Sequence, residues 1–158
     1  MKNGIFKKMV ESNGKLFFFT APDNYTSVPP TPNIYREQIP SKGNIVGIAP
    51  DTQEEGGIFF NRVFGNDNEF YIFHDMLKAR NGNLILSGVY KSNQIKRNEG
   101  HNYHGDEDGF IMEFSTHSKS LVSFRCYGSN KNDKFNSIRE CRDGSFIAVG
   151  ETLSIWNT

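Results

Sequence analysis

Two histidines and three acidic residues form the sharpest polar cluster in this sequence. His101 and His104 lie three residues apart, and Asp106, Glu107 and Asp108 follow after Gly105. Imidazole and carboxylate groups bind zinc and other transition metals, so this segment is a candidate metal site. The acidic residues lack the alternating Asp-x-Asp-x-Asp-Gly spacing of a calcium loop. The segment also lies between expected strands, and we favour the alternative interpretation of a solvated loop without a metal.

No residues are arranged for nucleophilic catalysis or for phosphate binding. The sequence has no Gly-x-Ser-x-Gly elbow, and His74 and His117 fall in different predicted units. The segment that begins at Gly65 lacks the second and third glycines of a dinucleotide fingerprint. Glu54-Glu55 reads as a turn, so no pair of acids is singled out for glycoside hydrolysis. We therefore predict a protein that is not an enzyme and needs no cofactor.

Exposed aromatic residues are the better candidates for binding. Tyr25, Tyr35, Tyr103 and Trp156 fall in predicted loops or near the end of the sequence. Their flat faces could stack on sugars or peptides, which makes a glycan or a protein a possible ligand. The alternative is that these side chains cover the hydrophobic body, and Trp156 could equally pack into a neighbouring subunit.

Composition excludes several classes of partner. Eighteen basic residues balance eighteen acidic ones, with a pI near 6.9, which argues against nucleic acid as the main partner. The mean hydropathy is −0.57, and no apolar run is long enough to cross a bilayer. The first fifteen residues contain no apolar stretch of a secretory signal, so the protein either stays where it is made or begins after a removed signal.

The two cysteines are expected to remain reduced. Cys126 falls near the end of one predicted strand and Cys141 at the end of the next, so a strand length separates their thiols. A disulfide needs Cα atoms within about 7 Å of each other. We therefore predict two free thiols that are buried or half-buried.

Three turn signals divide the chain into hairpins. Asn13-Gly14, Asn81-Gly82 and Asp143-Gly144 are dipeptides in which both residues tolerate a positive φ, which favours tight hairpins. An apolar run follows each turn and predicts a strand buried on both faces. These runs are Leu16 to Phe19, Leu84 to Leu86, and Phe146 to Val149.

Further strands extend the hairpins to groups of four, four and two. The additional strands span residues 44–50, 57–64, 109–114 and 121–127. The Pro-rich segment 21–42 and the polar segment 93–108 are the long connections, and we expect them to form the variable binding surfaces. Residues 1–158 then make one all-β repeat domain with units at about 5–64, 65–127 and 128–158.

Two aspartates recur in the polar turns of this repeat. Asp67 follows Phe64-Gly65, and Asp133 follows Tyr127-Gly128. An aspartate in a turn accepts hydrogen bonds from backbone amides, so we predict a structural role for both carboxylates. A ring of repeated carboxylates that binds cations is the alternative.

The last unit resembles a known repeat. Its pattern is close to FGG-x-x-x-D-x-F-x-S-I, followed by DGGYIVAG-x-T-x-S and D-x-W-L-V-K, and it occurs in blade-like units of bacterial, often Bacteroidetes, surface and secreted proteins. The matching positions are Tyr127-Gly128-Ser129, Asp133, Phe135, Ser137-Ile138, Asp143 to Gly150, Thr152 and Ser154, with Asp108 to Glu113 similar to the D-x-W-L-V-K strand. The preceding unit keeps Phe64-Gly65, Phe73, Asn81-Gly82, Gly88 and Ser92.

The resemblance implies an all-β, β-propeller-like fold of four-stranded blades at the cell surface or outside the cell. The chain supplies about two and a half blades, whereas propellers close with four to eight. Several chains could complete one another, the chain could be part of a longer protein, or the strands could pack as a compact β-sandwich. We favour self-association, because blade faces are buried only against neighbours.

The expected function is therefore that of a non-enzymatic structural or interaction module that associates with itself or joins a larger assembly. A carbohydrate-binding or carbohydrate-active surface protein, and a structural component of a virion or cell envelope, are the alternatives.

Overall fold

A computed structural model describes residues 5–12, 14–21, 43–48, 58–65, 68–92 and 107–153. Every regular element within these ranges is a β-strand, and every strand pairing is antiparallel. The prediction of an all-β fold is confirmed. No helix in the described ranges is long and apolar enough to span a membrane.

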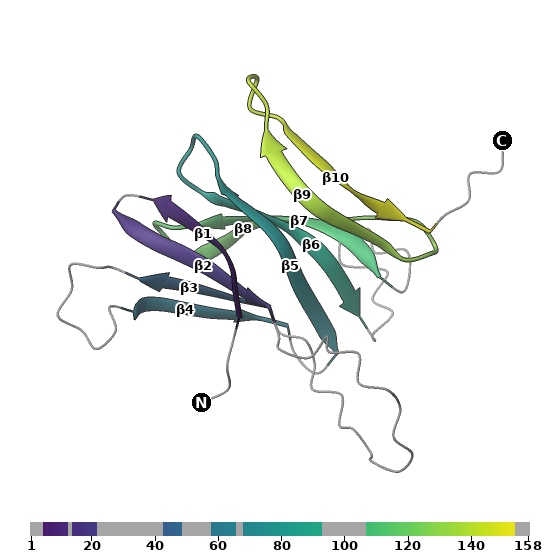
Figure 1. Cartoon of the computed structure of the whole chain (residues 1–158), viewed down its shortest axis with the longest axis horizontal. Coiled ribbons are helices and arrows are strands. Elements are labelled where there is room, and N and C mark those ends of the chain that lie inside the picture. Colours follow the sequence, from purple (N-terminus) through teal and green to yellow (C-terminus); the bar gives the residue numbers. More distant parts are fainter. Residues whose placement is uncertain are drawn as a thin grey trace, which may run out of the picture.

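The described strands follow one another in three open sheets. Their bounds are β1 Ile5–Ser12, β2 Lys15–Ala21, β3 Gly43–Ile48, β4 Ile58–Phe64, β5 Glu69–Lys78, β6 Leu84–Ser92, β7 Asp108–Ser115, β8 Ser120–Tyr127, β9 Asp133–Glu140 and β10 Phe146–Thr152. Two four-stranded sheets have the orders β1-β2-β3-β4 and β5-β6-β7-β8, and β9 pairs with β10 alone. Figure 1 shows the β5–β8 sheet between the other two. The predicted grouping of four, four and two strands is confirmed.

Three hairpins form where their turn sequences predict them, but in the two fully described turns the positive φ falls on the glycine and not on Asn81 or Asp143. Gly14, Gly82 and Gly144 adopt positive φ angles of 72°, 84° and 88°, a region that costs a residue with a Cβ about 1–2 kcal/mol. The last two turns contain the same backbone hydrogen bond, from the glycine N to the carbonyl oxygen three residues before it. Gly82 N donates to Ala79 O at 2.9 Å, and Gly144 N donates to Cys141 O at 3.1 Å.

The same irregularity interrupts each of these hairpins. One residue of the first strand is skipped in the pairing: Lys7 in β1, His74 in β5 and Asn136 in β9. Such a β-bulge bends a strand and redirects the side chains on either side of it. Glycine lies opposite the residue before the bulge in two of the hairpins, at Gly88 and Gly150, whereas the first hairpin has Thr20 there.

The main core lies between the two four-stranded sheets, which face each other like the layers of a sandwich. Sheet β1–β4 contributes Phe17, Phe19, Ile45 and Phe64, and sheet β5–β8 contributes Phe73, Met76, Leu84, Leu86, Tyr90, Phe110, Met112, Phe114 and Cys126. Aromatic rings meet edge to face across this core, as Phe19 and Phe73 do at 6.0 Å between ring centroids.

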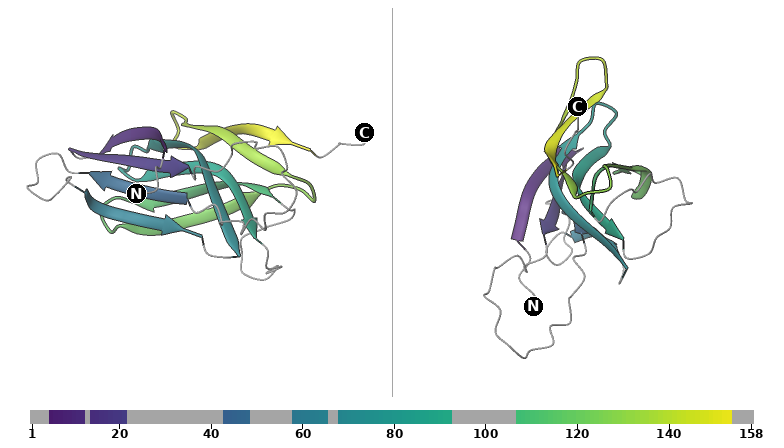
Figure 2. Two further views of the ribbon diagram at one scale, coloured as in Figure 1. Left: turned by 60° about the horizontal axis from the view of Figure 1, so that its bottom comes forward. Right: turned by 90° about the vertical axis from the view of Figure 1, so that its right-hand side faces the viewer.

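A smaller core lies on the opposite face of the β5–β8 sheet. Ile85 and Ala79 pack there against Ile138 of β9, with Leu77, Ile111, Phe146 and Ala148 around them. The centre of the β5–β8 sheet is thus covered on both faces, and β6 is buried from Leu84 to Tyr90, as its apolar run predicts, whereas the edge strand β8 is mostly exposed. In the right-hand view of Figure 2 the β9–β10 hairpin projects beyond the other strands.

The expectation of burial on both faces is wrong for β10 and only partly right for β2. Ile147 and Val149 are each 58% exposed, because no described strand covers the outer face of the two-stranded sheet. In β2, Phe17 and Phe19 are buried whereas Phe18 is half-buried. An apolar run indicates that both faces of a strand are suited to burial, but it does not show whether a second sheet covers each face.

The long connections fall mostly outside the described residues. Ala21 ends β2, and the remainder of the Pro-rich segment 21–42 is not among the residues described. The same holds for residues 93–106 of the second connection. Both cysteines are free, with Cys126 buried and Cys141 partly buried, which confirms the prediction of two reduced thiols.

Candidate functional site at the junction of the three sheets

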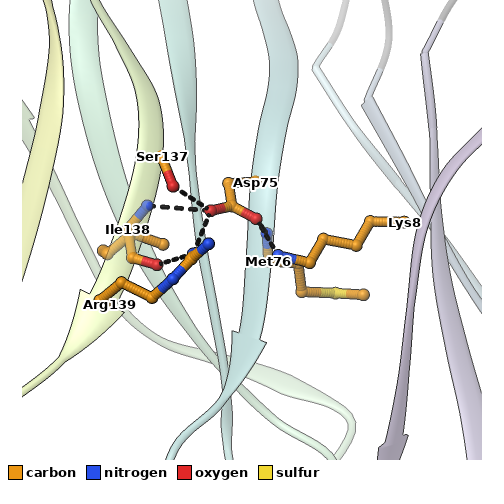
Figure 3. A network of polar contacts seen from close by, with 6 residues as sticks. All are labelled: Lys8, Asp75, Met76, Ser137, Ile138 and Arg139. Atoms are coloured by element: carbon orange, nitrogen blue, oxygen red, sulfur yellow. Dashed lines mark hydrogen bonds and ion pairs between the residues drawn. The ribbon is translucent and has the colours of Figure 1, made fainter.

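Asp75 joins the first two sheets. It follows the bulge of β5, and its residue surface is only 5% exposed. Its Oδ1 accepts hydrogen bonds from Lys8 Nζ of β1 and from Met76 N at 2.9 Å (Figure 3). The ammonium group of Lys8 therefore brings a positive charge from sheet β1–β4 to a carboxylate of sheet β5–β8.

The other carboxylate oxygen of Asp75 joins the third sheet. Its Oδ2 accepts hydrogen bonds from three consecutive residues of β9 (Figure 3): Ser137 Oγ at 2.8 Å, Ile138 N at 3.0 Å and Arg139 Nη1 at 2.8 Å. Arg139 Nη1 also donates to Ile138 O at 2.6 Å, which holds the guanidinium group in place. One carboxylate thus receives donors from all three sheets.

The bulges explain why these side chains meet. Lys8, Asp75 and Ser137 each occupy the first pair beyond the skipped residue of their hairpin. The skipped residue of β5 adds a contact of its own. His74 Nδ1 lies 2.8 Å from Phe135 O, so this nitrogen must carry the proton, since a carbonyl oxygen only accepts.

The Asp75 carboxylate is held in its ionised form. Burial by itself raises its pKa, but the hydrogen bonds from Lys8, Ile138, Ser137 and Arg139 outweigh that effect. The pKa of Asp75 consequently lies well below its usual range. Because both oxygens are occupied by donors and the group stays charged at neutral pH, it is suited to holding sheets together and unsuited to accepting a proton.

A second polar clamp links the hairpin turns of the last two sheets. Arg80 N donates to Glu140 Oε2 at 3.0 Å. The Arg80 guanidinium group donates to two carbonyl oxygens of the next turn, Cys141 O and Arg142 O, each at 2.7 Å. A planar guanidinium with several donors suits such multiple recognition. Arg80 therefore fixes the position of the β9–β10 turn relative to the β5–β6 turn.

Asp133 has the structural role that its place in a turn predicts. It is buried, and its Oδ2 accepts hydrogen bonds from Ser129 N at 2.7 Å and Ser129 Oγ at 3.0 Å. Burial raises its pKa, but bonds from Thr152 and Ser129 outweigh that and lower it. The prediction for Asp133 is confirmed, and Asp67 lies outside the described residues.

The candidate metal site is largely outside the described residues. His101, His104 and Asp106 are not described, whereas Asp108 is the first residue of β7 and is completely buried. The interpretation of a solvated loop is therefore wrong for Asp108, because pairing with Tyr90 draws it into the sheet. In the described part of the chain, no group of three or more His, Cys, Asp or Glu side chains could hold a metal ion.

The candidate binding aromatics also lie outside the described residues. They are Tyr25, Tyr35, Tyr103 and Trp156. Among the described tyrosines, Tyr71 and Tyr90 pack edge to face in the core at 5.0 Å between ring centroids, whereas Tyr127 is 44% exposed and lies beside Phe135. Burial, and then nearby charges that include Glu69, raise the pKa of both phenols well above the usual value.

Sequence reasoning missed Asp75, Lys8 and Arg139. One signal was available, since Asp75 is a lone acid within the apolar stretch that runs from Phe70 to Leu77. A charged residue at a buried strand position needs partners. The identity of those partners depends on how the sheets stack, which the sequence pattern does not state.

The two cysteines should differ sharply in reactivity. Burial, and then the charge of Asp108, raise the pKa of the Cys126 thiol to about 12, so little thiolate forms at pH 8. Cys141 is only partly buried. We expect a thiol reagent to label Cys141 in the native protein and Cys126 only after unfolding. A Cys141→Ser variant that still labels rapidly in the native state would contradict this expectation.

No protein-family model matches the sequence, and no curated protein is similar to it.

Proposed function

We propose that the protein is a non-enzymatic interaction module, built from β-propeller-like units, that associates with further copies of itself. The observation that carries the proposal is the presence of exposed apolar side chains on the outer strands at both ends of the stack of sheets. Ile147 and Val149 are 58% exposed on the hairpin, and Met9 is 56% exposed on β1. Apolar surface of this kind marks a site of association when it forms a contiguous patch.

The arrangement of the sheets supports a propeller-like unit. Each four-stranded sheet is an up-and-down meander, and the sheets pack face to face in chain order. The hairpins share their turn, their bulge and the polar position beyond it. These features are consistent with three versions of one unit, the third represented by its first two strands.

The β9–β10 hairpin supports association for an energetic reason. An isolated two-stranded sheet is at best marginally stable in water, so this hairpin depends on its contacts with the β5–β8 sheet. Those contacts cover only one of its faces. A second sheet on the outer face would remove the exposed side chains of Ile147 and Val149 from water.

Sedimentation velocity of a Val149→Asp variant tests this proposal. We expect the unmodified protein to sediment faster with increasing concentration and the variant to show little increase, because a charge on the outer face opposes its burial. The control is Ser118→Asp, in the exposed β7–β8 turn, which should behave like the unmodified protein. Equal behaviour of the unmodified protein and Val149→Asp would contradict the proposal.

A further inference from the structure

The second strand of each hairpin has two equivalent positions whose side chains are buried in the first two hairpins and exposed in the third. These positions belong to the first and third residue pairs after the bulge. They are Phe19 and Phe17 in β2, Ser87 and Ile85 in β6, and Val149 and Ile147 in β10. The β2 and β6 residues are at most 1% exposed, because the next sheet along the chain covers them. Only in β10 is this face uncovered.

The opposite face shows the reverse order. The second pair beyond the bulge places Met9, Met76 and Ile138 on the first strand of each hairpin. Met76 and Ile138 are fully buried against the preceding sheet, whereas Met9 is 56% exposed on β1. The chain therefore presents the hairpin half of this junction exposed at one end of the stack. At the other end it presents a sheet face on which Met9 is exposed at the edge strand, while Phe18 is half-buried and Val46 is buried.

The polar part of the junction can be followed in the same way. Within the chain, the Arg80 backbone N donates to the Glu140 carboxylate of the next hairpin at 3.0 Å, and the Arg80 side chain forms an ion pair with it at 3.9 Å between Nε and Oε1. Glu11 is equivalent to Glu140, because each belongs to the fourth residue pair after the bulge of its hairpin. Arg142 is equivalent to Arg80, because each comes two residues after the end of the first strand of its hairpin. Glu11 and Arg142 are both exposed. Residues of opposite charge thus occupy the two positions that form the ion pair of the internal junction, and Glu11 Oε1 accepts a hydrogen bond from Gly14 N of its own turn at 2.7 Å.

We propose that the outer face of the β9–β10 hairpin of one copy packs on the outer face of the β1–β4 sheet of a second copy. This inference rests on the proposed self-association and specifies its geometry. Ile147 meets Met9, as Ile85 meets Ile138 within the chain, and Arg142 meets Glu11. A contact between two different faces is heterologous, so it builds a closed ring or an open chain of copies.

Two variants that each disable one face test this geometry. Met9→Asp blocks the sheet face and Ile147→Asp blocks the hairpin face. Both residues are more than half exposed, so the fold should tolerate the changes. We expect each variant alone to be monomeric by light scattering at concentrations where the unmodified protein associates. An equimolar mixture should form a complex of two chains, because each variant keeps the face that the other lacks.

The outcomes separate this geometry from the broader proposal. Association of Met9→Asp alone, at the strength of the unmodified protein, would overturn the geometry but leave self-association standing. A mixture that stays monomeric would also overturn the geometry. An unmodified protein that never associates would overturn both proposals.

Charge exchange tests the Arg142–Glu11 pair separately. We expect Arg142→Glu and Glu11→Arg each to weaken association at least tenfold, and the double variant to recover to within about threefold of the unmodified protein. Lys131→Glu, in the exposed β8–β9 turn, is the matched control. Equal affinity of the three charge variants and the unmodified protein would exclude this pair.

Discussion

Replacing Gly88 with alanine is expected to destabilise the protein by more than about 3 kcal/mol. A Cβ at Gly88 would lie 1.8 Å from Ile72 O, a backbone atom of the neighbouring strand. Gly88 pairs with Phe73 beside the bulge, in a strand that is buried on both faces. The carbonyl oxygen cannot move away without breaking the pairing that places Asp75, so the strain cannot be relieved locally.

A second glycine of the same hairpin is the matched control for Gly88→Ala. Gly82 has a positive φ of 84°, and a Cβ there would meet nothing within 4 Å. Gly82→Ala should therefore cost only the left-handed backbone term, about 1–2 kcal/mol. Urea denaturation at one protein concentration measures both changes. A cost for Gly88→Ala no greater than that for Gly82→Ala would show that the close approach is not a constraint.

Replacing Asp75 with asparagine is expected to cost about 3 kcal/mol at pH 7, the scale for breaking a buried, paired charge. The amide keeps the shape of the side chain but removes the negative charge shared by Lys8 and Arg139. Its NH₂ group also faces donors where the carboxylate accepted bonds. Ser137→Ala is the milder comparison, because it removes one of five donors, at about 1 kcal/mol.

The loss of unfolding free energy caused by Asp75→Asn should become smaller as the pH falls. The pKa of Asp75 is lowered in the folded state, so its contribution to stability is present above the unfolded value of about 3.9. That contribution is lost as the pH falls from about 5 through 3.9 toward the lower folded pKa. The difference in unfolding free energy between the two proteins should therefore shrink from pH 7 to pH 3. A difference that stays constant would mean that the carboxylate charge does not stabilise the fold.

Local chemistry made the strands and turns predictable from the sequence. Asn81-Gly82 and Asp143-Gly144 identify hairpins because the positive φ required at their glycines restricts which residues fit. The apolar run that begins at Leu84 identified a strand buried on both faces, and the structure places it in the middle sheet. The strand and the turn depend on neighbouring residues alone, whereas the burial of both strand faces also requires covering sheets, which β6 has and β10 lacks.

Contacts between distant residues were not predictable in the same way. Asp75 lies 67 residues from Lys8 and 64 from Arg139, and their meeting depends on the bulge register and on the stacking of three sheets. The exposure of Ile147 also escaped prediction, because hydrophobicity describes what a side chain prefers and not whether a covering sheet is present.

Light scattering of the unmodified chain over a wide range of micromolar concentrations tests the central claim most directly. The claim is that the outer faces of the terminal sheets bind other copies of the chain. The expected result is a molar mass that rises with concentration from 18.0 kDa toward whole multiples of it. A mass that remains at 18.0 kDa throughout that range would contradict the claim.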